Sequence, residues 1–194
     1  ENILRVAKRA EEAGIAALAL HGRTREDMYL NTARYDLIKE VKQLIRIPVV
    51  ANGDIDSPEK AKYVLDYTGA DAIMIGRAAQ GRPWIFREIA HYLETGEHLA
   101  APSIQEVKEV LLGHLAELYA FYGEYSGCRI ARKHIAWYTK GLRSSNEFRQ
   151  NMYKVESTTE QFKVVADYFE QLLIHGETMN DVQVEPVSYT HLRA

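Results

Sequence analysis

Residues 48–76, PVVANGDIDSPEKAKYVLDYTGADAIMIG, contain an apolar run, a helical stretch and a second apolar run, in that order. The apolar runs at 48–51 and 71–75 are continuous rather than alternating, and each precedes a loop that contains glycine. Ser57 and Pro58 supply an N-cap and a first-turn proline for the helix between them, and Gly69 follows its end. The stretch therefore predicts a strand, a helix and a parallel strand.

The same pattern extends toward the N-terminus, with helical periodicity over 1–13 and 36–45 and a further apolar run at 15–20. Continuous apolar strands that alternate with helices indicate a parallel sheet covered on both faces. An open doubly wound sheet and a (β/α)₈ barrel both satisfy this pattern. Because three βα units cannot close a barrel, a barrel would place its first five strands upstream. We therefore interpret the chain as a fragment.

The strand pattern stops after residue 83, and the rest of the chain has helical patterns. Helices are expected over 84–96, from a cap at Ser103 to Gly123, and at about 128–142, 146–153 and 158–174. The sequence thus predicts an α/β part at 1–97, an all-helical part at 98–175, and a tail at 176–194 that is disordered or artefactual.

The composition is that of an ordinary globular protein, with 46% hydrophobic and 26% charged residues. The sole cysteine, Cys128, excludes an internal disulfide and favours a reducing cytoplasm. No apolar stretch approaches the length of about 18 residues that a membrane span needs, so no membrane association is expected. A formal net charge of −3 gives no global sign of nucleic-acid binding, so such a sign must be local.

Polar loops follow all three expected strands, and parallel α/β folds bind ligands at this end of their strands. The loops begin with HGRTR, NGD and GR, and their candidate binding residues are His21, Asn52, Gly53, Asp54, Gly76 and Arg77. Glycine lets backbone N–H groups approach a phosphate, and arginine can bind it with two hydrogen bonds. Taken alone, each loop also has an ordinary structural interpretation, as a turn glycine, a hydrogen-bonded histidine or a solvated arginine. Their concurrence predicts a phosphate or flavin site.

A run without acidic residues lies between Ser126 and Ser145. On a helix its cations fall within one sector of about 100°, and they are Arg129, Arg132, Lys133, Lys140 and Arg143. A solvated face is the ordinary explanation of a charged stripe, but such faces usually mix signs. A stripe of one sign favours a polyanion backbone as partner. His134 and the tryptophans are expected to pack, whereas one or two exposed tyrosines could stack on bases.

The segments HGRTR, PVVANGDI, GADAIMIGRAAQGRPWIF and GCRIARKHIAWY, in this order and spacing, resemble the tRNA-dihydrouridine synthase family. The resemblance runs from residue 1 to about residue 173. It implies a flavin enzyme that uses FMN and NADPH to reduce uridine in tRNA to dihydrouridine. It also implies an FMN-bearing (β/α)₈ barrel, of which this chain holds the last three βα units, followed by a helical bundle that helps hold tRNA.

Site roles follow from the same resemblance. His21 would contact FMN after the sixth barrel strand, while the NGD loop and the Gly76-Arg77 loop would hold the FMN phosphate after the seventh and eighth. The cationic stripe would bind tRNA, and Arg82 in QGRPW is a further candidate for that role.

Family members carry a lysine near FMN and a proton-donating cysteine in a Gly-Cys-Pro segment of the upstream half, and neither feature occurs here. The chain alone is therefore predicted to be inactive, without a catalytic residue, and to bind FMN weakly. Cys128 is interpreted as a bystander on a cationic helix. Two alternatives stay open, a helical RNA-binding module on a scaffold and another FMN- or phosphate-binding barrel oxidoreductase. No metal and no obligate protein partner are expected.

Overall fold

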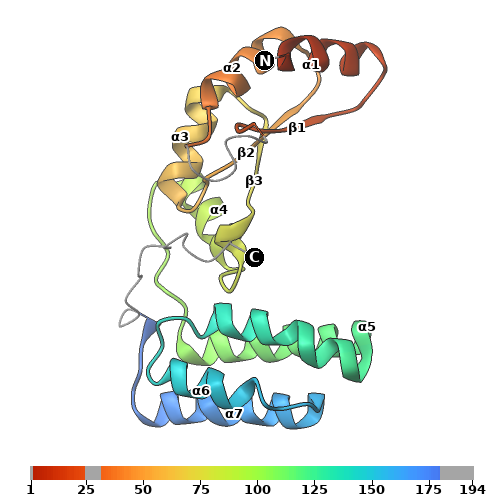
Figure 1. The fold of residues 1–194 in the computed structure, drawn as a ribbon. Coiled ribbons are helices and arrows are strands. Elements are labelled where there is room, and N and C mark those ends of the chain that lie inside the picture. Colours follow the sequence, from red (N-terminus) through yellow and green to blue (C-terminus); the bar gives the residue numbers. More distant parts are fainter. Residues whose placement is uncertain (1, 25–31, 180–194) are drawn as a thin grey trace. The chain divides into compact units, whose positions relative to one another are not determined.

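The computed structural model describes residues 2–24 and 32–179, and Figure 1 shows their fold. The chain divides into two compact units, residues 1–99 and 100–194. The first unit combines strands and helices, and the described part of the second is helical. Most of the expected tail, 180–194, lies outside the described residues. No helix among the described residues is long and apolar enough to cross a membrane.

The first unit contains a parallel sheet in the order β1-β2-β3. Its strands are Leu18–His21, Val49–Asn52 and Ala72–Met74. The predicted strands and their parallel arrangement are confirmed. The register pairs His21 with Asn52 and Asn52 with Met74, so these three residues form one row at the carboxyl end of the sheet.

Four helices accompany the strands, and α2, α3 and α4 lie along one side of the sheet in Figure 1. Their bounds are Ile3–Glu12 for α1, Tyr35–Leu44 for α2, Pro58–Thr68 for α3 and Ile85–Thr95 for α4, with a 3₁₀ turn η1 at Arg77–Ala79. Ser57 caps α3 as predicted, because its Oγ accepts a hydrogen bond of 3.1 Å from the Lys60 N–H.

Only one face of the sheet is covered within the described residues. Leu18, Leu20 and Ile73 pack with the helices into one apolar core. The opposite face alternates with them and carries Ala19 and Met74, both of which are exposed. The expectation of a sheet covered on both faces is thus met on the helical side only.

The second unit contains α5 (Ile104–Tyr138), α6 (Ser145–Met152) and α7 (Thr158–Ile174). Ser103 and Glu106 form a capping box at the start of α5. Gly123 interrupts α5 with φ 72° and ψ −177°, a conformation that is essentially restricted to glycine. The chain reverses direction there. The reversal brings the rings of His114 and His134, from the two halves of α5, to 4.7 Å from each other. The predicted break at Gly123 is confirmed.

The second half of α5 differs from the sequence expectation at both ends. It begins directly after Gly123 instead of at residue 128, and it ends at Tyr138 instead of residue 142. The hydroxyl of Thr139 donates to the Ile135 carbonyl at 2.8 Å, and Gly141 has φ 81°. Lys140 and Arg143 therefore lie beyond the helix. Of the five cations predicted to share one helix, only Arg129, Arg132 and Lys133 lie on it.

Candidate functional site

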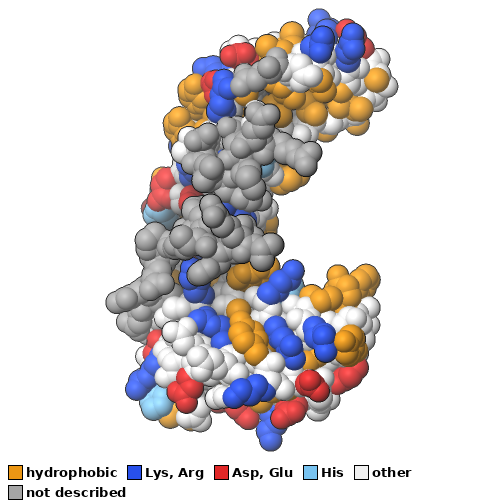
Figure 2. Space-filling view, in the orientation of Figure 1, with side chains coloured by type: hydrophobic (Ala, Val, Ile, Leu, Met, Phe, Trp, Pro, Cys, Tyr) orange, Lys and Arg blue, Asp and Glu red, His pale blue; other side chains and the backbone are white. Residues whose placement is uncertain are grey.

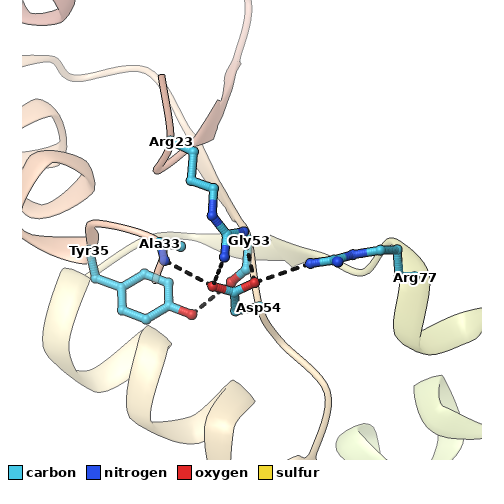
Figure 3. Close-up of polar contacts among 6 residues, drawn as sticks. All are labelled: Arg23, Ala33, Tyr35, Gly53, Asp54 and Arg77. Atoms are coloured by element: carbon cyan, nitrogen blue, oxygen red, sulfur yellow. Dashed lines mark hydrogen bonds and ion pairs between the residues drawn. The ribbon is translucent and has the colours of Figure 1, made fainter. Parts of the chain in front are cut away.

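The carboxylate of Asp54 joins the loops that follow all three strands (Figure 3). From the loop after β1, the guanidinium of Arg23 donates two hydrogen bonds to it, of 2.8 and 2.7 Å. From the loop after β3, Arg77 Nη2 lies 3.4 Å from Asp54 Oδ1. The Ala33 N–H, just before α2, donates a further bond of 2.9 Å. Asp54 thus holds together loops that are far apart in the sequence.

The electrostatics of this junction favour an ionised Asp54. Burial by itself raises the pKa of the carboxyl, but the hydrogen bonds from Arg23 and Ala33, with the charges of Arg23 and Arg77, outweigh burial. The pKa of Asp54 is therefore held below its ordinary value. Two guanidinium groups, which are donors suited to an anion, thus lie beside this carboxylate.

Gly53 is required by packing and backbone conformation at this junction. A Cβ on Gly53 would lie 2.8 Å from the Cβ of Ala33, and its φ is +123°. The Tyr35 hydroxyl donates a 2.7 Å hydrogen bond to the Gly53 carbonyl. Burial, followed by the charge of Asp54, raises the pKa of Tyr35 to about 12, so this donor stays protonated at neutral pH. The glycine of NGD thus has a structural reason that is independent of any ligand.

Gly76 is different, because nothing lies within 4 Å of the position that its Cβ would occupy. Its φ of −105° is not in the left-handed region. It precedes η1, whose first residue is Arg77, and the Arg77 side chain is 44% exposed. Gly76 and Arg77 therefore offer open space beside a guanidinium at the carboxyl end of β3.

His21 and Asn52 share the row at the end of the sheet with Met74. Both lie on the face that the helices do not cover, and His21 is exposed. The His21 ring also lies next to Gly53, with Nε2 3.6 Å from the position of a Cβ there. The structure thus gathers the six candidate binding residues at one end of the sheet. Their ligand stays a prediction.

Sequence reasoning left Arg23 as a possible solvated charge and did not single out Ala33 or Tyr35. The Arg23 side chain is in fact only 7% exposed, and it donates two hydrogen bonds to Asp54. No sequence signal identifies this pair, because the pair follows from the strand register, which aligns His21 with Asn52 two residues before each partner. Arg25, in the same loop, lies outside the described residues.

Arg82 forms hydrogen bonds with other residues of the first unit. Its Nη2 lies 2.6 Å from the Glu88 carboxylate, and its Nη1 is 3.4 Å from the Asp56 carbonyl. Arg82 therefore holds the segment before α4 against the loop after β2. A role in tRNA binding stays a prediction for this residue.

The five cations of the predicted stripe separate into two groups. Arg132 is partly buried and donates from Nη2 to the Val155 carbonyl at 3.0 Å, so it fixes the loop before α7. Arg129, Lys133, Lys140 and Arg143 are exposed. A role in tRNA binding stays a prediction for all five.

His134 is partly buried and Cys128 is buried, and both have surroundings that suit a structural role. The His134 ring lies 4.7 Å from that of His114 and 5.0 Å from that of Trp137. Burial and the neighbouring charge of His114 lower the pKa of His134, which favours its neutral form. Cys128 is 1% exposed, and burial raises its pKa. Within the described residues, no group of three or more His, Cys, Asp or Glu is placed to hold a metal ion.

Comparison with known proteins assigns the chain to a family. Residues 1–173 match the family model described as dihydrouridine synthase (Dus). The tRNA-dihydrouridine synthase B of Vibrio vulnificus (strain CMCP6) is 56% identical over 172 residues, which cover 89% of this chain and 53% of the relative. The protein of the same name from Pseudomonas aeruginosa is 57% identical over 175 residues, covering 90% of this chain and 53% of the relative. The chain spans about half the length of these curated relatives, and it belongs to the dihydrouridine synthase family.

Proposed function

We propose that this chain is the C-terminal portion of a flavin-dependent tRNA-dihydrouridine synthase, which reduces uridine in tRNA to 5,6-dihydrouridine with FMN and NADPH. In this proposal β1, β2 and β3 are the last three strands of a (β/α)₈ barrel. One observation carries it: Asp54 joins the loops after three consecutive parallel strands and brings the guanidinium groups of Arg23 and Arg77 to one place. Strand ends of this kind are where barrel enzymes bind phosphate.

The junction fits the phosphate of FMN. Arg77 is the more exposed of its two arginines, and Gly76 beside it leaves space for close approach of a ligand to the backbone. Arg23 and Asp54 neutralise each other and orient the loops around this position. We assign the phosphate to Gly76 and Arg77, with the NGD loop next to it.

His21 would lie toward the flavin ring, because it is exposed in the last row of the uncovered sheet face, beside Asn52 of the NGD loop. When bound, FMN supplies hydride transfer. The residues of this chain bind and orient it. Reduction of uridine also needs a proton donor, and the sole cysteine is buried in the helical unit. We therefore place the proton donor in the rest of the protein and expect no turnover from this chain alone.

A titration of the full chain with FMN and with riboflavin, followed by flavin fluorescence, tests the phosphate assignment. Riboflavin is the matched probe because it has the same ring system and no phosphate. Arg77→Ala should weaken FMN binding roughly tenfold or more, the loss of a charge-assisted bidentate contact, and should leave riboflavin binding unchanged. Arg87→Ala, which removes an exposed arginine on α4, is the control. Equal FMN affinity of Arg77→Ala and Arg87→Ala would overturn the assignment.

The proposed tRNA partner rests on two observations. The similar proteins are named tRNA-dihydrouridine synthases, and the helical unit presents exposed cations with no acidic residue between Ser126 and Ser145. Figure 2 shows Lys and Arg side chains next to hydrophobic ones over α5.

A further inference from the structure

Four side chains recur at every fourth position along the second half of α5. They form a row that we call the aromatic-cation stripe, which consists of Tyr125, Arg129, Lys133 and Trp137. Residues four apart on a helix lie one above the other on the same face, about 6 Å apart along its axis. The stripe thus places two neighbouring cations between two aromatic rings.

The contacts within the stripe confirm that its members lie together. The Arg129 guanidinium lies over the ring of Tyr125, with Cζ 4.2 Å from the ring centroid. Lys133 Nζ lies over the ring of Trp137 at 5.6 Å. Each aromatic ring therefore holds one cation in place through a cation–π contact. Because both cations are held, less conformational entropy is lost when an anion binds them.

Exposed aromatic rings continue from the stripe to the turn of the helical hairpin. Tyr125 is 68% exposed, and Phe121, just before the turn at Gly123, is 81% exposed. The Phe121 ring packs edge-on against that of Tyr122, at 4.8 Å. Large exposed rings at one end of a unit indicate an interaction surface.

Along the second half of α5, every Asp, Glu, Lys or Arg after Glu124 is a cation. The nearest carboxylate along the helix, that of Glu124, is engaged by the backbone N–H and the hydroxyl of Thr158. No acidic residue follows it before Glu147. Exposed cations next to exposed rings fit a ligand with both anionic groups and flat apolar faces.

We infer that the aromatic-cation stripe binds a single-stranded segment of RNA, with consecutive phosphates at Arg129 and Lys133 and an unpaired base stacked on the Tyr125–Arg129 platform. This inference rests on the proposed tRNA partner and adds a defined subsite to it. Single strands expose the faces of their bases to aromatic rings and guanidinium planes, whereas a duplex hides them. A helix that offered only cations would bind either form through its phosphates.

The test measures affinity of the full chain for a tRNA transcript, a single-stranded oligoribonucleotide and a blunt RNA duplex, each over a series of salt concentrations. Tyr125→Ala should weaken binding of the transcript and the single strand roughly tenfold, the scale of one lost stacking contact. It should leave duplex binding and the salt dependence unchanged, and Tyr125→Phe should restore affinity because it keeps the ring. Tyr153→Ala, at another exposed tyrosine of the same unit, is the matched control.

Arg129→Ala and Lys133→Ala should act differently from Tyr125→Ala. Each should lower the slope of log affinity against log salt by roughly 0.7, the value for one phosphate contact on a single strand. The inference is overturned if Tyr125→Ala binds the transcript as tightly as Tyr153→Ala, if it weakens duplex binding equally, or if the unsubstituted chain binds no RNA. The flavin titration contains no RNA. It therefore decides the assignment of the FMN phosphate to Arg77 whether or not the stripe binds RNA.

Discussion

Arg23 and Asp54 form a two-point ion pair between the ends of β1 and β2, with hydrogen bonds of 2.8 and 2.7 Å. The Arg23 side chain is 7% exposed and that of Asp54 is 24% exposed. Removal of the carboxylate takes two charge-assisted hydrogen bonds from an arginine that is largely shielded from water, and such a loss is costly.

Asp54→Asn should therefore destabilise the protein by about 2 to 3 kcal/mol, the range for lost hydrogen bonds to a charged group. The midpoint of urea unfolding, followed by circular dichroism, measures this change. Asp56→Asn, two residues on and exposed, should change the free energy of unfolding by less than about 0.5 kcal/mol. Equal midpoints for the two variants would show that the pair contributes nothing to stability.

The same carboxyl predicts a pH dependence. Despite partial burial, the hydrogen bonds from Arg23 and Ala33 hold the pKa of Asp54 in the folded protein below its ordinary value, so the folded state favours the ionised form. The stabilisation is complete above the unfolded-state pKa and is lost as pH falls from about 4 through the folded-state pKa. The free-energy difference between the unsubstituted chain and Asp54→Asn should accordingly shrink between pH 6 and pH 3. A constant difference across this interval would contradict the predicted ionisation.

Two glycines of the candidate site should respond differently to alanine. Gly53→Ala forces a Cβ to within 2.8 Å of Ala33 at a φ of +123°, and it should cost about 2 to 3 kcal/mol of stability. Gly76→Ala meets no atom within 4 Å, so it causes no such clash and should lower the unfolding midpoint less than Gly53→Ala does. If the FMN phosphate lies at Gly76, this variant should still bind FMN more weakly, since the added methyl group fills the space beside Arg77. A folded Gly76→Ala chain with unchanged FMN affinity would exclude close approach of the phosphate there.

Cys128 should be unreactive while the protein is folded. Its side chain is 1% exposed, burial raises its pKa, and its Sγ lies 3.5 Å from the Val155 carbonyl. Thiol reagents attack the thiolate, which is scarce at neutral pH in such surroundings. Labelling with a chromogenic disulfide reagent at pH 7.5 should be slow in buffer and complete in 6 M urea. Rapid labelling of the folded chain would contradict the burial of this thiol.

Much of the first unit could be predicted from local signals. The Ser57-Pro58 start of α3 and the glycine that follows it depend on the backbone chemistry of a few adjacent residues. Three continuous apolar runs alternating with helices were sufficient to predict parallel strands, and parallel strands bring the loops at their carboxyl ends together. The candidate site was therefore located by topology before any contact was known.

The contacts within the site required the register, which depends on packing across the whole sheet. The pairing of Arg23 with Asp54 follows only after His21 is aligned with Asn52, and nothing in the loop sequences sets that alignment. The end of α5 at Tyr138 was missed for a similar reason. Periodicity continues through residue 142, whereas Gly141, at φ 81°, directs the chain out of the helix.

The two glycines of α5 provide a last test of the helical hairpin. Gly113 lies within the first half of α5, and nothing lies within 4 Å of the position of its Cβ. Gly113→Ala should stabilise the protein by about 0.5 to 1 kcal/mol, because alanine loses less backbone entropy in a helix. Gly123→Ala should destabilise it by about 1 to 3 kcal/mol, because φ 72° with ψ −177° is essentially closed to a residue with a Cβ. Thermal unfolding of both variants measures the contrast. If Gly123→Ala proved as stable as Gly113→Ala, α5 would have to continue straight through residue 123, and the contact between His114 and His134 would be lost.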